Sequence, residues 1–185
     1  QDQEREILAG LVERVTFHNP DNGFCVLRVK ARGQRDLITT VGHAATISAG
    51  EWITASGVWI NDRNHGLQFK AHFLKTSAPS TVEGIEKYLG SGMIRGIGPV
   101  YAKRLVKQFG TDVFDIIEAS PERLREVEGI GPVRATRIIS GWADQKVIRE
   151  IMVFLHQHGV GTARAVRIFK TYGADAVQVM SENPY

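Results

Sequence analysis

A glycine pattern that occurs three times in the second half of this 185-residue chain constrains its fold more than any other feature. Each copy reads glycine, aliphatic residue, glycine, three further residues, alanine, two residues and an aliphatic residue. The copies begin at Gly96, Gly129 and Gly159, so they lie 33 and 30 residues apart. Repetition of one unit at such a period indicates a repeat architecture.

Backbone chemistry explains the unit as two helices joined by a tight hairpin. The first glycine permits the positive φ with which many helices end. The second glycine, which is Gly98, Gly131 or Gly161, is expected to let the chain turn sharply into the next helix. Pro99 and Pro132 stand at the first helical position, where a missing N–H costs nothing. Each hairpin therefore presents a helix N-terminus whose unpaired N–H groups can bind a phosphate.

Charge is sorted along this half of the chain, although a net charge of +3 does not by itself indicate a nucleic-acid partner. The windows 95–108, 129–141 and 159–171 hold nine basic residues and no acidic residue, whereas 109–128 holds six acidic residues. Such sorting is expected of a surface that faces phosphates. We expect the third hairpin, which has Thr162 in place of proline, to be packed or partly disordered and to contribute least. The candidate DNA-binding residues of the hairpins are Gly96, Gly98, Lys103, Arg104, Gly129, Gly131, Arg134, Arg137, Gly159, Gly161, Arg164 and Arg167.

The first part of the chain follows a period of two instead. Five candidate strands are separated by turn sequences, and they span 10–18, 23–32, 36–43, 51–60 and 67–76. Five short strands without a long helix fit a small closed barrel. The predicted fold class is therefore β then α in two domains: a five-stranded OB-like barrel at 1–78, followed by an all-α tandem of helical hairpins at 79–185.

The second candidate strand suggests a further nucleic-acid surface. Phe24, Arg28 and Lys30 alternate with apolar residues, so they share the outer face of the barrel. An outward aromatic ring beside positive charges can stack a base and bind phosphates. A solvated face without a ligand is the alternative, and the sequence favours it because charged outer faces are usual in barrels.

No pattern in the chain indicates catalysis. The sequence has no Gly-x-x-x-x-Gly-Lys-Ser/Thr loop for ATP, no His-Glu-x-x-His and no Gly-x-Ser-x-Gly, so no catalytic residue, metal site or cofactor is predicted. Cys25, the single cysteine, is expected to be a core residue in a reducing cytoplasm. Trp52, Trp59 and Trp142 are also expected in the core. No apolar run approaches the ~18 residues that cross a bilayer, so no membrane partner is expected.

A longer period links pairs of hairpins. Residues 109–112 match residues 172–175 at an offset of 63 residues, and Pro121 matches Pro184 at the same offset. The larger unit is then a pair of hairpins, of which the first is complete and the second ends after one hairpin. We therefore expect the chain to be a fragment of a longer protein that continues with the missing hairpin.

The glycine units resemble the helix-hairpin-helix motif, which grips the DNA backbone without reading sequence. Residues 12–24, Gly50-Glu51-Trp52, Gly57-Val58-Trp59 and the closing Glu182-Asn183-Pro184-Tyr185 resemble the N-terminal extension of bacterial RecD-like ATP-dependent DNA helicases, of the exodeoxyribonuclease V alpha-subunit type. The resemblance implies a 5′ to 3′ helicase of DNA repair or recombination, with ATP and Mg²⁺ bound by a motor beyond Tyr185. The partners it implies are single-stranded or junction DNA and the motor domains of the same protein. The family's catalytic residues have no counterpart in this sequence.

Two other functions remain open at this point. A Holliday-junction-binding protein of the RuvA kind also joins an OB barrel to paired hairpins, although its first strand matches less well. A protein-interaction module that docks onto a motor or partner could use the same hairpins for packing alone. The salt dependence of DNA binding separates these functions, because a hairpin that contacts only protein shows no phosphate slope.

Overall fold

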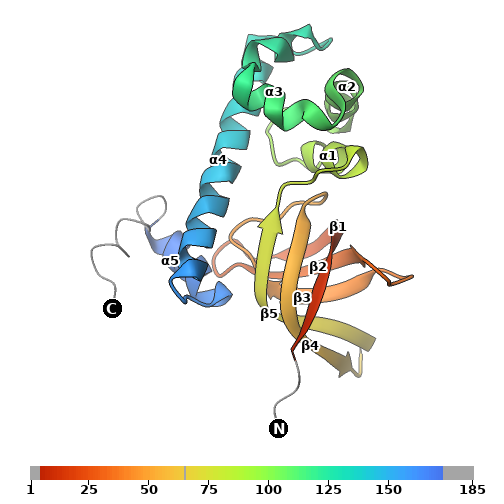
Figure 1. The fold of residues 1–185 in the computed structure, drawn as a ribbon, viewed down its shortest axis with the longest axis vertical. Coiled ribbons are helices and arrows are strands. Elements are labelled where there is room, and N and C mark those ends of the chain that lie inside the picture. Colours follow the sequence, from red (N-terminus) through yellow and green to blue (C-terminus); the bar gives the residue numbers. More distant parts are fainter. Residues whose placement is uncertain (1–4, 65, 173–185) are drawn as a thin grey trace.

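Five strands close into a barrel in the first part of the chain (Figure 1). The computed structural model describes residues 5–64 and 66–172. The strands are β1 (Glu6–His18), β2 (Phe24–Ala31), β3 (Ile38–His43), β4 (Trp52–Asp62) and β5 (Gly66–Ser77). They follow the order β1-β2-β3-β5-β4, and β4 pairs back with β1. β3 and β5 pair in parallel, and the other four strand pairs are antiparallel. Because the five strands close on themselves, the predicted five-stranded barrel is confirmed.

Buried and more exposed side chains alternate along β2, and the buried ones fill the barrel. Cys25, Leu27 and Val29 are fully buried, whereas Phe24 and Arg28 on the opposite face are partly exposed. Burial raises the pKa of the Cys25 thiol to about 12, so this thiol stays protonated and unreactive. The prediction of Cys25 as a core residue is confirmed.

The tryptophan prediction is wrong for Trp52, which is partly exposed and belongs to no core cluster among the described residues. Trp59 is also only partly buried, but its ring packs against the barrel core, with its centroid 5.2 Å from that of the buried Phe69. The Trp59 indole N–H donates to the Glu6 carboxylate at 2.6 Å, and the Arg32 guanidinium lies 5.6 Å from the Trp52 ring centroid. Trp142 is buried as predicted.

Helices make up the second part of the chain. They are α1 (Val82–Leu89), α2 (Pro99–Phe109), α3 (Val113–Ala119), α4 (Pro132–Gln157) and α5 (Thr162–Tyr172), with 3-10 turns at Gly110–Asp112 and Pro121–Glu126. One core joins α1, α2, α3 and the first half of α4 around side chains such as Leu105, Leu124 and Ile138. Together with the barrel, these helices confirm the predicted fold class. Among the described residues, no helix combines the length and hydropathy that crossing a membrane requires.

The long helix α4 is shared by two hairpins. Its 26 residues serve first as the second helix of the Gly129 hairpin and then as the first helix of the Gly159 hairpin. At 1.5 Å per residue it spans ~39 Å, and Figure 1 shows it running from the α1–α3 end down beside the barrel. A separate small core of Ile151, Leu155 and Ala165 holds α5 against its C-terminal half. The first and third hairpins therefore lie far apart.

Polar contacts fix the barrel to the helices. The Arg149 guanidinium of α4 donates to the Tyr88 hydroxyl of α1 at 2.9 Å and lies 3.4 Å from the Glu51 carboxylate, which is 1% exposed. Burial raises the pKa of Glu51 to about 7, and Arg149 opposes the shift. Gly50 lies so close to α1 that a Cβ there would come within 2.4 Å of the Tyr88 backbone nitrogen. The barrel and the helices α1 and α4 are therefore in direct contact at this joint.

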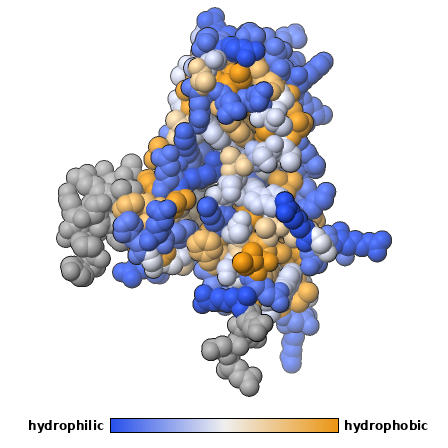
Figure 2. Space-filling view, viewed as in Figure 1, coloured by the Kyte–Doolittle hydropathy of each residue, from blue (hydrophilic) through white to orange (hydrophobic). Residues whose placement is uncertain are grey.

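Hydrophilic side chains predominate on the face of the molecule shown in Figure 2, and the hydrophobic patches on it are small. Such a face is ordinary solvated protein surface.

Candidate nucleic-acid interface

The first two hairpins have the same backbone geometry. Gly96 and Gly129 adopt φ values of 87° and 85°, a region that favours glycine, so the predicted role of the first glycine is confirmed. The intervening Ile97 and Ile130 are 2% and 4% exposed and anchor each turn in the core. The isoleucine of each hairpin is thus packed in the core, while the glycine before it stays exposed at the surface.

The second glycine of each unit does not have the special backbone conformation that the sequence analysis expected of it. Gly98 and Gly131 have φ values of −108° and −93°, which other residues also adopt, so the turn does not require glycine there. A Cβ at Gly98, Gly131 or Gly161 would meet no other atom within 4 Å. Nothing within the described part of the chain therefore demands a glycine at these three repeated positions. Glycine at such a place suits the close approach of another molecule to the backbone.

Helices α2 and α4 begin without side-chain caps. The first backbone bonds run from the Ala102 N–H to the Gly98 carbonyl and from the Ala135 N–H to the Gly131 carbonyl. Gly98 and Gly131 have no side chain to accept from the first turn, and no side-chain cap is present. The N–H groups that precede these bonds have no partner within their own helices. Two open helix N-termini, each carrying partial positive charge, result.

Arg104 and Arg137 each extend from the helix of one hairpin to the turn of the other. Arg104 of α2 donates to the Glu128 carbonyl at 3.1 Å, and a Cβ on Gly129 would lie 2.8 Å from its Nη1. Arg137 of α4 approaches Gly96 in the same way, since a Cβ there would lie 2.7 Å from its Nη1. The two guanidinium groups thus lie at the two hairpin turns, one at each.

The ring of Tyr101 contacts two arginine side chains, one from each of the first two hairpins. The guanidinium carbons of Arg134 and Arg104 lie 4.5 and 5.4 Å from its ring centroid, within the range of cation–π contacts. Arg134 also donates to the Gly129 carbonyl at 3.3 Å and is only partly exposed. Lys103 and Arg137 are exposed. Our sequence reasoning missed Tyr101, although it stands three residues after the second glycine, where Arg134 and Arg164 stand in the other units.

The third hairpin is packed against the barrel. Gly159 has a φ of 77°, so its turn repeats the geometry of the others. Thr162 is 3% exposed, and its hydroxyl accepts from the Leu74 N–H of β5 at 3.2 Å. A Cβ on Gly23 would lie 2.5 Å from Cγ1 of Val166, so α5 also touches the β1–β2 turn. This agrees with the expectation that the third hairpin is packed.

The structure separates the predicted residues into two groups. Lys103, Arg104, Arg134 and Arg137 gather around the first two hairpin tips, whereas Arg164 and Arg167 lie on α5 beside the barrel. On the barrel, Phe24, Arg28 and Lys30 share the outer face of β2 as predicted, and the Arg28 guanidinium donates to the Thr39 hydroxyl of β3. The matched residues at 173–175 and 184, and the closing 182–185 segment, lie outside the described residues.

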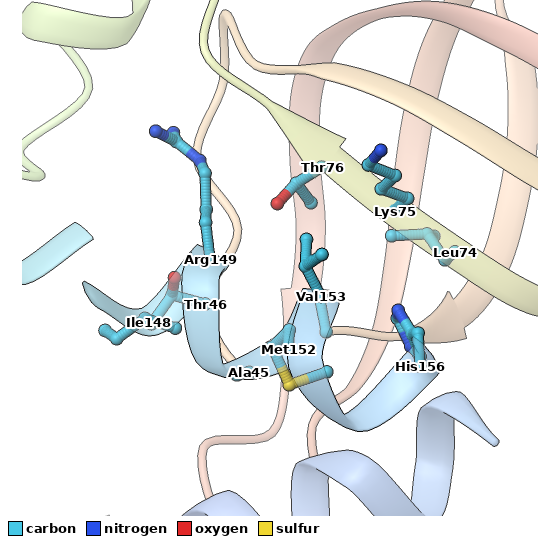
Figure 3. Close-up of a pocket in the computed structure, with 11 residues that line it drawn as sticks. Ala45, Thr46, Leu74, Lys75, Thr76, Ile148, Arg149, Met152, Val153 and His156 are labelled. Carbon is cyan, nitrogen blue, oxygen red and sulfur yellow. The ribbon is translucent and has the colours of Figure 1, made fainter. Parts of the chain in front are cut away.

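A cavity lies between α4 and the barrel (Figure 3). Side chains from the loop after β3, from β5 and from α4 line it, among them Thr46, Leu74, Met152 and His156. Its volume of about 20 Å³ leaves room for one water molecule. This cavity is too small for a nucleotide. Within the described residues, no group of three or more histidine, cysteine, aspartate or glutamate side chains could hold a metal ion.

Comparison with known proteins gives three consecutive family matches. Residues 5–79 match the OB-fold domain of the ATP-dependent DNA helicase YrrC, and residues 91–144 match the SAM-like helix-hairpin-helix tandem. Residues 144–185 match the helix-hairpin-helix domain of the ATP-dependent RecD2 DNA helicase. The ATP-dependent RecD2 DNA helicase of Deinococcus radiodurans is 27% identical over 182 residues. The match covers 95% of this chain and 25% of that relative, so the chain spans about a quarter of the relative's length.

Proposed function

Because the chain has the OB and helix-hairpin-helix domains of the RecD-like DNA helicases, we propose that it holds DNA by its phosphates, without reading base sequence, for such a helicase. The observation that carries the proposal is the pair of second glycines. Gly98 and Gly131 have ordinary φ values and empty space where a Cβ would stand, yet glycine recurs there. A phosphate that approaches the uncapped helix N-terminus needs that space.

The binding mode follows from the two hairpin tips. Phosphate oxygens accept from the first-turn N–H groups of α2 and α4, while the exposed Lys103 and Arg137 add charge. Arg104 and Arg134 are tied to backbone carbonyls, so they hold the tips in place as well as adding charge. Contacts of this kind position a protein on DNA but carry no base information.

The proposed setting is a longer protein of which this chain is a part. Motor domains that bind ATP and Mg²⁺ supply the strand separation, and the chain described here presents DNA to them. Single-stranded or junction DNA from repair or recombination is the proposed substrate. The likeness to the RecD2 helicase of Deinococcus radiodurans supports this assignment.

Salt dependence tests the hairpin contacts. Affinity for a short duplex should fall linearly on a log–log plot against salt concentration, with a slope set by the number of phosphates neutralised. Substitution of Lys103→Ala together with Arg137→Ala should reduce the magnitude of the slope by roughly one unit for each phosphate that the variant no longer neutralises.

The matched control removes the same charge from the barrel. Arg63→Ala with Lys70→Ala takes away two exposed cations, one in the β4–β5 turn and one within β5. It should leave the duplex slope close to that of the parent. Equal slopes for the two double variants would favour the protein-interaction function for the hairpins.

A further inference from the structure

An aromatic ring replaces a cation at one position of the repeated hairpin pattern. The third residue after the second glycine is Tyr101 in the first hairpin, whereas it is Arg134 in the second and Arg164 in the third. Tyr101 and Arg134 both stand in the first turn of a helix, in α2 and α4 respectively. The guanidinium carbon of Arg134 lies 4.5 Å from the centroid of the Tyr101 ring. An arginine at position 101 would therefore place two like charges side by side, and the tyrosine replaces that repulsion with a cation–π contact.

Few other contacts fix the Arg134 guanidinium. Its Nη1 donates to the Gly129 carbonyl at 3.3 Å, which is a long hydrogen bond. Its Nε is buried and has no acceptor within the described residues. Arg104, by contrast, lies farther from the ring at 5.4 Å and donates to the Glu128 carbonyl at 3.1 Å. The Tyr101 ring is therefore the principal support of Arg134 and a secondary one of Arg104.

Arg134 stands at an electrostatically unfavourable place. The first-turn N–H groups of α4 carry partial positive charge, which repels a cation beside them. No acidic residue stands in this first turn to offset the charge. A phosphate at the N-terminus of α4 would meet the guanidinium and the uncapped N–H groups together, so its negative charge makes the arrangement favourable.

The Tyr101 ring is itself fixed by its surroundings. It is only partly exposed, and it packs against the core that joins α1, α2, α3 and α4. It also lies against the turn of the second hairpin, since a Cβ on Gly129 would be 2.8 Å from its Cε1. A side chain held against such a fixed ring loses less conformational entropy when it binds a ligand.

We propose that Tyr101 is a positioning residue for DNA binding by the second hairpin. Its ring holds the Arg134 guanidinium at the N-terminus of α4, where a phosphate binds, and it acts through that cation instead of through a contact of its own with DNA. The inference rests on the phosphate binding proposed for the hairpins. It adds an asymmetry, because the second hairpin has the supported cation and the first hairpin has the ring that supports it.

A double-mutant cycle in the whole chain tests this role. Tyr101→Leu keeps an apolar side chain against the core but removes the ring, so duplex affinity at low salt should fall roughly three- to tenfold. In the Arg134→Ala background the same substitution should have no further effect, because the cation that the ring supports is absent. Tyr101→Phe keeps the ring and should bind like the parent. The matched control is Phe169→Leu, which removes a partly exposed ring beside Lys170 on α5 and should also bind like the parent.

A second measurement requires no substitution. In NMR spectra of the parent, the ring current of Tyr101 should shift the δ-methylene protons of Arg134 upfield, whereas the exposed Arg137 should give ordinary shifts. Ordinary shifts for Arg134 would overturn the proposal even if Tyr101→Leu does not fold.

The outcomes separate this inference from the proposed function. A loss of affinity on Tyr101→Leu that occurs only when Arg134 is present supports the positioning role. Equal losses in the two backgrounds, a comparable loss in Tyr101→Phe, or no loss at all overturns it and leaves the phosphate binding of the hairpins intact. If the variant with Lys103→Ala and Arg137→Ala keeps the full salt slope, the proposed phosphate binding fails and this inference fails with it.

Discussion

Arg104 and Arg137 occupy equivalent positions in α2 and α4, 33 residues apart, and each lies against the first glycine of the other hairpin. Because each arginine contacts the turn of the other hairpin, the two hairpins support each other. The same contacts also bring two open helix N-termini into one fixed arrangement. In the proposed binding mode this arrangement lets the two hairpins hold two phosphates at once.

The first glycines should matter for stability. Gly96→Ala forces a side chain into a φ of 87° beside Arg137, and we expect the free energy of unfolding to fall by ~1–2 kcal/mol. The arginine can move aside, so the backbone conformation accounts for most of the loss. Urea unfolding measures it. Unfolding of Gly96→Ala at the same urea concentration as the parent would contradict this role of the first glycine.

Thr162 should anchor the third hairpin to the barrel. Thr162→Val removes the hydroxyl that accepts from the Leu74 N–H and leaves a buried donor unpaired, which costs ~1–3 kcal/mol. Thr162→Ser keeps the hydroxyl and is the control. Hydrogen exchange of the Leu74 amide should become faster in the valine variant alone. Unchanged protection in that variant would show that this bond does not hold the hairpin.

The buried Glu51 carboxyl should make stability depend on pH. Its pKa is about 7 in the folded protein against a usual 4.5, so the folded state binds more protons than the unfolded state between these values. The contribution of Glu51 to the free energy of unfolding is therefore fully present below pH 4.5 and is lost as the pH rises through 7.

The control for this effect is Glu51→Gln, which cannot titrate. Denaturation midpoints measured from pH 5 to pH 8 should fall with rising pH in the parent and should change less in the glutamine variant. Parallel curves for the two proteins would exclude Glu51 as the source of the dependence.

The chain itself should not hydrolyse ATP. Its sequence has no Gly-x-x-x-x-Gly-Lys-Ser/Thr loop for the phosphates of ATP. Phosphate release measured with ATP, Mg²⁺ and single-stranded DNA should stay at the buffer rate. Activity that co-purifies with the chain and grows with DNA would reveal a site that the sequence and structure have not shown.

Local patterns predicted most of the fold. Alternation along β2 indicated which residues fill the barrel, and the strand bounds differ from the prediction by a few residues; β1, for example, begins at Glu6 and not at Gly10. Turn residues such as Gly23, with a φ of 79°, mark the strand ends in the sequence. These features depend on neighbouring residues, so a single sequence contains them.

Contacts between distant residues were the part that could not be predicted. Arg149 contacts Glu51, which is 98 residues away in the sequence, and Thr162 contacts Leu74, which is 88 residues away. No periodicity relates such pairs, because they depend on how α4 lies beside the barrel. The same holds for Trp52, whose large apolar ring suggested a core position although it is partly exposed beside Arg32.

A side chain placed on the second glycines tests most directly whether the hairpin tips hold DNA. Gly98→Ser with Gly131→Ser supplies each helix with a capping hydroxyl where a Cβ meets no neighbour, so the free energy of unfolding should stay unchanged or rise slightly. The same hydroxyls occupy the first-turn N–H groups and fill the space that a phosphate needs. Duplex affinity, measured by fluorescence anisotropy at low salt, should therefore fall at least tenfold in a variant as stable as the parent. A stable double variant that binds duplex as tightly as the parent would contradict the claim that these helix N-termini hold DNA.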